Sequence, residues 1–208
     1  MTWTVWIPLL LACLVISLTP GAGAINTMTN SLTQGWRRSL WGIIGQQAAL
    51  VVHIGIVAAG VGLVVSRSPL LFTTIRWAGA AYLVYLGIRM LMQRGGAVSR
   101  SAGTAGSAER GWSMARRGFW VNLLNPKAIV FFLAFVPQFI RLDQAALPQY
   151  LVLGATVVLV DVAVMWFFFA AAARPLRRLT TTDRGARLLD RVFGSLFLAV
   201  AGLLAFAS

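Results

Sequence analysis

The sequence predicts an all-α integral membrane protein with six transmembrane helices, built as two inverted three-helix repeats with broken helices 1 and 4. Three observations support this fold class: a very high hydrophobicity, six long apolar stretches, and helix-breaking motifs at corresponding places in the two halves. Of the 208 residues, 59% are hydrophobic, and the mean hydropathy of +0.80 is far above that of soluble domains. Because the apolar stretches are continuous rather than alternating with period two, a transmembrane β-barrel is excluded.

Six apolar stretches are long enough to cross a bilayer, which takes about 20 residues of helix. Gly, Ala and Ser with scattered arginines form a linker between the third and the fourth stretch. We expect one transmembrane domain over residues 1–208, with repeat one at about 1–93, a cytoplasmic linker at about 94–113 and repeat two at about 114–208. Since each repeat has three spans, the second must cross the membrane in the opposite sense. The predicted spans are residues 4–24, 40–65, 70–92, 118–140, 149–173 and 188–207.

The basic residues that give the net charge of +13 are distributed unevenly among the loops. If the N-terminus is outside, the outer loops hold only Arg67 and Arg141, and the other loop arginines lie inside. This asymmetry is the positive-inside rule, so we expect both termini on the outer side. It also explains the basic charge without nucleic acid, which we do not expect as a partner. The inner arginines are Arg37, Arg38, Arg94, Arg100, Arg110, Arg116, Arg117, Arg174, Arg177, Arg178, Arg184, Arg187 and Arg191.

The first apolar stretch has an alternative interpretation as a cleaved signal peptide, because residues 22–24 (AGA) resemble a cleavage site. No Lys or Arg precedes this stretch, although a signal peptide begins with a basic region. Cleavage would also remove the first of the two broken helices. We therefore expect the stretch to remain as the first span.

Helix-breaking motifs interrupt the first and the fourth apolar stretch. A proline within a helix removes one backbone hydrogen bond and clashes with the preceding turn, and lipid cannot satisfy the freed groups. Such breaks occur where they line a polar cavity, and paired breaks in two inverted halves indicate the substrate site of a transporter. The motifs consist of Thr19, Pro20 and Gly21 in the first half and of Asn125, Pro126 and Lys127 in the second.

Few ionisable residues lie inside the predicted spans, where a charge at the bilayer centre costs about 2.5–3.5 kcal/mol. Asp161 lies near the middle of the fifth span, and His53, the only histidine, lies deep in the second. We hypothesise that both residues couple protons to transport. Two structural alternatives stay open: a neutral His53 bonded to a neighbouring helix, and an Asp161 paired with Lys or Arg. Pairs about 106–108 positions apart support the duplication: Pro20 and Pro126, His53 and Asp161, Gly87 and Gly194.

The candidate substrate-binding groups gather at the two breaks. The N–H groups after each proline and the helix dipoles favour an anion, and Lys127 adds a positive charge at the second break. Snorkelling of Lys127 to the inner interface is the alternative. Gln46 lies seven residues before His53 and therefore on the same helix face. The full set is Thr19, Pro20, Gly21, Asn26, Gln46, Asn122, Asn125, Pro126 and Lys127.

Segments along nearly the whole chain resemble the lysine-exporter (LysE) superfamily. The most specific are SLTPGAGAINTMTNSL in the first span and FWVNLLNPKAIVFFLAFVPQFI in the fourth. Within the superfamily the chain is most similar to the exporters of homoserine and homoserine lactone in the resistance to homoserine/threonine (RhtB) group. The resemblance implies a multi-pass protein of the bacterial inner membrane that exports small neutral amino acids and derivatives by proton antiport. Homoserine, its lactone and threonine are the implied substrates, with leucine or another neutral amino acid as the alternative.

The resemblance also bears on substrate charge. Exporters of basic amino acids in the superfamily are expected to carry a carboxylate where this chain has Gln46 and Gln47, which argues against a cationic substrate. A zwitterion such as homoserine needs an anion holder, a cation holder and one hydrogen-bonding group. We expect its carboxylate at the half-helix N–H groups near Pro20 or Pro126, its ammonium at Asp161 and neighbouring carbonyls, and its hydroxyl at Gln46, His53 or Asn125.

Two other function classes fit the sequence less well. A six-span intramembrane enzyme would use His53 and Asp161 as acid and base, but no nucleophile motif or HExxH supports it. A metal-ion exporter would need more ligands than one histidine and one membrane aspartate, and Cys13 is the only cysteine. We therefore expect no enzyme activity, no metal and no cofactor. The expected partners are a small amino acid, protons and the lipid bilayer, and a homo-oligomer stays open.

Overall fold

The computed structural model describes residues 2–67, 108–141 and 143–175 continuously, with single residues and short groups between 70 and 92 and between 182 and 202. The predicted spans 70–92 and 188–207 and most of the predicted linker therefore lie outside the continuously described residues. Every regular element that is described is a helix, in agreement with the predicted all-α class. The elements are α1 (Trp3–Leu18), α2 (Ala22–Gln34), α3 (Leu40–Arg67), α5 (Gly111–Leu123), α6 (Pro126–Phe135), η1 (Val136–Phe139), α7 (Ala146–Ala163) and η2 (Val164–Ala170).

Both predicted helix breaks are confirmed. The axis turns by 57° between α1 and α2, and by 56° between α5 and the helix that runs from Pro126 to Phe139. The first break follows from Pro20, which has no backbone N–H to continue the ladder of α1. The polar stretch after it does not end the helix, because α2 continues to Gln34. The first break therefore lies within a bent helix pair rather than at its end.

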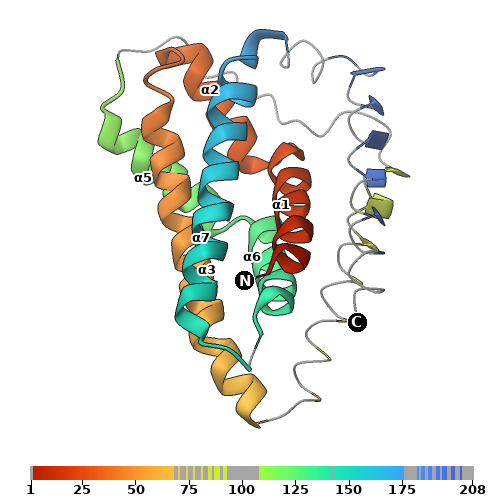
Figure 1. The fold of residues 1–208 in the computed structure, drawn as a ribbon. Helices are drawn as coiled ribbons and strands as arrows, with labels where there is room; N and C mark the ends of the chain where they lie inside the picture. The colour runs from red at the N-terminus through yellow and green to blue at the C-terminus, as the bar shows by residue number, and fades with distance from the viewer. Residues whose placement is uncertain are drawn as a thin grey trace.

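Two helices in the described residues are long and apolar enough to cross a membrane, and four do so if each bent pair counts as one span. The two continuous ones are Leu40–Gly60 of α3 and Ala146–Ala170 of α7 and η2, with hydropathies of 1.7 and 2.3. Figure 1 shows α3 and α7 running together along the long axis, with α5 on one side and α1 and α6 on the other. The two halves of the bent pair α5–α6 thus lie on opposite sides of α3 and α7 in this view.

Small residues allow α3 and α5 to pack with their backbones in contact. A Cβ atom added to Gly45 would collide with the carbonyl oxygen of Ala115, and one added to Gly118 would collide with that of Gly42. Such small-residue crossings are the usual way for membrane helices to approach closely. Helix α5 begins at Gly111, inside the stretch 94–113 predicted as a linker and ahead of the span start predicted at residue 118. The fourth helix is therefore longer at its N-terminal end than predicted, and it packs against α3.

The apolar core is divided into two clusters. One is centred on Leu9, Phe135 and Leu153 of α1, α6 and α7, and the other on Ile43 and Phe169 of α3 and η2. Large apolar side chains also cover the outer surface, as expected for a protein whose solvent is lipid: Ile44, Val51, Ile56, Leu151, Leu159 and Phe167 are exposed. Buried polar side chains gather at the breaks and beside them: Ser17, Thr19, Asn26, Thr27, Gln46, Gln47, Asn122 and Asp161.

Candidate functional site

The two helix breaks meet at one cavity of about 60 Å³. A single water needs about 10–15 Å³ by such a measure, so the cavity has room for several waters or a small ligand. A Cβ atom added to Gly21 of the first break would lie 3.5 Å from Lys127 Cδ and 3.9 Å from Asn125 Nδ2 of the second. Most of the predicted site residues line this cavity: Thr19, Gly21, Gln46, Asn122, Asn125, Lys127 and Asp161.

The carboxyl end of α1 presents backbone carbonyls that have lost their helical donors. Ile16 O would accept from the N–H of residue 20, but Pro20 has none. Thr19 O lies beyond the last turn of α1. The Lys127 ammonium donates to both oxygens, with Nζ 2.9 Å from Ile16 O and 2.7 Å from Thr19 O. Lys127, predicted as a substrate-binding residue, therefore caps the half-helix α1 rather than snorkelling away.

The amino end of α2 has no side-chain cap, because its N-cap residue is Gly21. The first backbone hydrogen bond into α2 is donated by Ile25 N to Gly21 O at 3.0 Å, so the N–H groups of residues 22–24 have no partner within the helix. Gly23 and Ala24 line the cavity. Gln46 of α3 holds this turn in place, since its Nε2 donates to Gly23 O at 3.2 Å and to Thr27 Oγ1 at 3.0 Å.

The second break is capped by its own residues. The Asn125 side chain accepts from Lys127 N at 3.1 Å, and Pro126 occupies the first turn of α6, where its missing N–H does no harm. Asn125 N donates to Asn122 O at 3.1 Å. The Asn122 side chain in turn donates to Gln46 O at 3.1 Å. Asn122 and Asn125 therefore serve as supports of the break, and both also face the cavity.

Asp161 is buried, with 9% of its surface exposed, and both of its oxygens accept hydrogen bonds. Ser17 Oγ donates to Oδ1 at 3.0 Å, and Gln47 Nε2 donates to Oδ2 at 2.7 Å. Among the described residues the ion pairs join Arg117 to Glu109 and Arg141 to Asp143, so Asp161 is not in a direct salt bridge. Lys127 attracts it electrostatically across the cavity.

His53 lies beside the second break but is not part of the cavity wall. Its Nε2 donates to Leu123 O at 3.2 Å, and its ring stacks on Phe132 with centroids 5.6 Å apart. Its Nδ1 is buried without a hydrogen-bond partner. His53 on α3 thus contacts the end of α5, just as Asp161 on α7 contacts Ser17 near the end of α1.

Comparison with known proteins identifies the family. A model of the LysE type translocator family matches residues 14–208. The chain belongs to this family. A homoserine/homoserine lactone efflux protein of Salmonella typhimurium is 42% identical over 207 residues, covering 100% of this chain and 98% of the relative. An uncharacterized membrane protein of Vibrio cholerae is 41% identical, with coverages of 98% and 97%. A leucine efflux protein of an Enterobacter species is 29% identical, with coverages of 91% and 90%. No solved structure matches the chain.

Family membership confirms that the chain is a membrane translocator of amino acids and not an enzyme. The predicted resemblance to the LysE superfamily and to homoserine efflux proteins is confirmed as well. In this LysE type translocator, the cavity between the broken helices combines one carboxylate and one ammonium with amide and backbone groups. No group of three His, Cys, Asp or Glu side chains that would suit a metal ion occurs in the described part of the chain.

Four predicted residues of the translocator do not line the cavity: Pro20, Asn26, His53 and Pro126. Pro20 and Pro126 act through the backbone, which they break. Asn26 accepts from Arg117 Nε at 3.3 Å on α5, and Arg117 also pairs with Glu109 at 2.8 Å. Asn26 therefore joins a polar network between α2 and α5, one turn away from the site.

Sequence reasoning missed Ser17 and Gln47, which hold the two oxygens of Asp161. A weak signal existed for Gln47, because adjacent residues of a helix point about 100° apart. Gln46 and Gln47 therefore cannot face the same partner, and the structure directs one to α2 and the other to Asp161. Ser17 gave no signal of its own, since a serine in a membrane helix is common.

Proposed function

We propose that this chain exports small neutral amino acids and their derivatives, homoserine and homoserine lactone first and threonine as a further substrate, from the cytoplasm by proton antiport. The observation that carries the proposal is the cavity itself, where Asp161 and Lys127 lie between two broken helices. Opposite charges in one small cavity complement a zwitterion. The relative with 42% identity over the full length is a homoserine/homoserine lactone efflux protein.

The proposed binding pose of the substrate follows from the first break, where the start of α2 has no side-chain cap. The substrate carboxylate binds the N–H groups at the start of α2, because Gly21 gives them no side-chain cap and a helix N-terminus favours an anion. The ammonium binds near Asp161 and the carbonyls at the end of α1. Gln46 and Asn125 are the hydrogen-bonding groups for the hydroxyl, since both line the cavity.

Proton coupling is assigned to Asp161 and His53. Asp161 lies in the cavity, where a proton and a substrate ammonium compete for the same carboxylate. His53 contacts Leu123 O at the second break, so a change in its charge acts on the hinge between α5 and α6. In this mechanism proton entry from outside releases the substrate, and proton loss inside restores the site.

An inverted repeat of three plus three spans supplies the alternating access. Contacts that relate one half of the chain to the other support this repeat. His53 meets Leu123 at the end of α5, and Asp161 meets Ser17 at the end of α1. A Cβ atom on Gly87 would lie 2.9 Å from Gly194 O, and one on Gly194 would lie 2.8 Å from Gly87 O. A contact in which each residue meets its own counterpart is what a two-fold axis between the repeats would produce.

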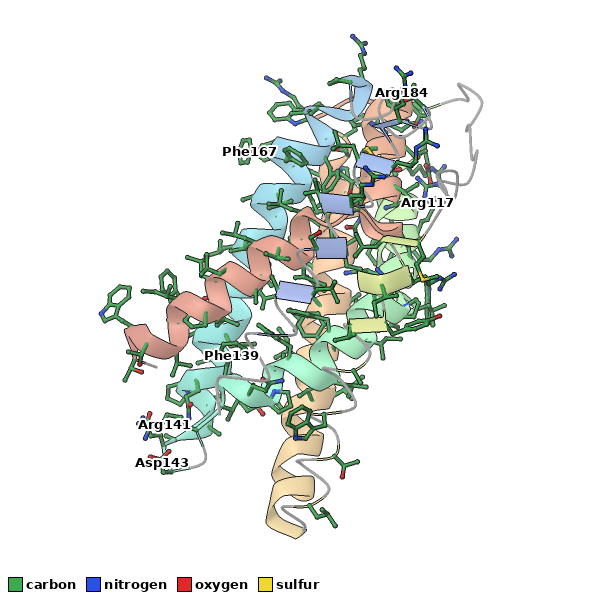
Figure 2. All side chains as sticks on the ribbon, turned by 90° about the vertical axis from the view of Figure 1, so that its right-hand side faces the viewer. Arg117, Phe139, Arg141, Asp143, Phe167 and Arg184 are labelled. Carbon is green, nitrogen blue, oxygen red and sulfur yellow. The ribbon has the colours of Figure 1, made fainter. Side chains whose placement is uncertain are left out.

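The proposed orientation places the arginine-rich end in the cytoplasm and both termini outside, in the inner membrane of a bacterium. Figure 2 shows Arg117 and Arg184 toward one end of the molecule and Arg141 and Asp143 at the opposite end. Two of the predicted inner arginines and the predicted outer Arg141 are thus separated along the long axis. The positive-inside rule assigns the end with Arg117 and Arg184 to the cytoplasm.

A second candidate substrate is leucine or a similar apolar amino acid. The observation in its favour is the apolar part of the cavity wall, formed by Leu50, Phe131, Phe132 and Val157. A relative named as a leucine efflux protein is 29% identical over 191 residues. The higher identity to the homoserine efflux protein and the polar side chains that also line the cavity favour homoserine over leucine.

Transport by the purified protein in proteoliposomes tests the proposal. We expect counterflow of labelled homoserine that unlabelled homoserine, its lactone and threonine stimulate, with leucine weaker and lysine without effect. An imposed pH gradient should drive uptake into inverted vesicles against a concentration gradient. Counterflow with leucine alone would reassign the substrate, and homoserine uptake that ignores the pH gradient would exclude proton antiport.

A further inference from the structure

Lys127 holds a position that an independent cation would also fill. It is the only lysine of the chain, since the other basic residues are all arginine. Its ammonium donates to Ile16 O and Thr19 O, and these oxygens lie at the negative end of the α1 dipole. Two carbonyls at a helix carboxyl end form a cation site, and here a side chain from the opposite half of the molecule occupies it.

The same site matches the α-ammonium group of an amino acid. An alkylammonium is a compact cation with three N–H donors, whether it belongs to lysine or to a substrate. The N–H groups of residues 22–24, which suit a carboxylate, follow Thr19 within a few residues across the same break. Acceptors and donors therefore lie next to each other, as the ammonium and carboxylate do on the α-carbon of an amino acid.

We propose that the carbonyls of Ile16 and Thr19 are the substrate's ammonium site, and that the Lys127 ammonium occupies it as a tethered stand-in until substrate displaces it. This inference rests on the proposed amino-acid export and specifies how the substrate is held.

The geometry supports such an exchange. Ile16, Thr19 and Lys127 all line the cavity, so an incoming ligand reaches the carbonyls from the space that Lys127 already occupies. The lysine side chain is a flexible four-carbon chain, and Gly21 beside it adds no side chain that would block its movement. Once displaced, the ammonium stays in the cavity, where Asp161 attracts it.

The alternative role for Lys127 is direct binding of the substrate carboxylate, and the two roles predict opposite results. The probes are aminopropanol, which is homoserine without its carboxylate, and hydroxybutyrate, which is homoserine without its ammonium. Binding of each is measured on the purified full-length protein, as wild type, K127M and K127R. R141Q serves as the matched control, because Arg141 is an exposed cation outside the cavity.

We expect K127M to bind aminopropanol about tenfold more tightly than wild type, as removal of a competitor that occupies the site about nine-tenths of the time would give. R141Q should match wild type, K127R keeps a competing cation and should not show the tenfold gain of K127M, and hydroxybutyrate should bind wild type, K127M and R141Q alike. Unchanged or weaker aminopropanol binding in K127M would overturn the proposal, and so would a loss of hydroxybutyrate binding in K127M alone.

A measurement on the wild type covers the case in which K127M does not fold. Acetylation of the single lysine by a brief pulse of a small reagent, followed by mass spectrometry, should become at least about threefold faster with saturating aminopropanol, because the lysine amine leaves the carbonyls. The rate is corrected for the reagent that aminopropanol, itself a primary amine, consumes. An unchanged or slower rate would contradict the displacement. If the wild type binds homoserine but fails these tests, only this inference fails, whereas a wild type that binds no neutral amino acid overturns the proposed function as well.

Discussion

The two helix breaks bend by nearly the same angle, 57° and 56°, but they satisfy their backbone groups in different ways. At the second break, Asn125 caps α6 and His53 donates to Leu123 O. At the first break, Gly21 offers no cap, and the carbonyls of α1 depend on Lys127 from the other half. The second break has a local cap, whereas the first is completed by a residue distant in sequence.

This difference indicates where a ligand binds. A substrate competes poorly with a cap that is already part of the chain, since the cap costs no translational entropy. The first break has uncapped N–H groups and carbonyls whose only described partner is a flexible side chain. We therefore place the substrate at the first break, although the sequence allowed either Pro20 or Pro126, and we regard the second break as its support.

The largest expected effect is that of D161N. This change removes the negative charge beside the first break while keeping the shape. It also replaces one acceptor oxygen with an NH2 donor, so that Ser17 and Gln47 can no longer both donate to residue 161. Charge-assisted hydrogen bonds contribute about 1.5–3 kcal/mol, which predicts a fall in homoserine export of about 10- to 100-fold and loss of the response to pH. The measurement is homoserine uptake into inverted vesicles at several imposed pH gradients.

Two further variants serve as comparisons for D161N. D143N removes an exposed aspartate that pairs with Arg141, and it should transport like wild type. H53Q keeps an N–H donor for Leu123 O but cannot titrate, so we expect about threefold weaker dependence on the pH gradient. Full pH-dependent transport by D161N would remove Asp161 from the mechanism, and an unaffected H53Q would leave His53 a structural role only.

An intermediate effect is expected at the support of the second break. G118A places a methyl group against Gly42 O, where α5 and α3 touch, and such overpacking costs about 1–3 kcal/mol. In an open position the same change would stabilise a helix by about 1 kcal/mol. Thermal unfolding in detergent should therefore show a lower midpoint for G118A.

Gly55 is the matched control for Gly118, because a Cβ atom there meets nothing within 4 Å. G55A should have the midpoint of wild type or a slightly higher one. If G118A unfolds at the same temperature as G55A, the close crossing of α3 and α5 is not what holds the second break in place.

Much of this arrangement was predictable, for identifiable physical reasons. Pro20 and Pro126 locate both breaks because proline has no N–H. Asp161 was predicted because a buried charge is costly and therefore rare. The partners of these groups were not predictable, since which carbonyl Lys127 reaches depends on how two distant half-helices pack. The position of Asn26 away from the cavity has the same origin, because Arg117 binds it from α5.

The smallest expected effect comes from removing the cap that distinguishes the second break. N125A leaves Lys127 N without its side-chain acceptor, which makes the second break resemble the uncapped first one. Loss of an N-cap costs about 1 kcal/mol, so we expect a modestly lower unfolding midpoint. N125S keeps an acceptor at this position and should recover most of the loss. If N125A and N125S unfold together at the wild-type temperature, the Asn125 cap does not stabilise α6, and the proposed difference between the two breaks loses its energetic basis.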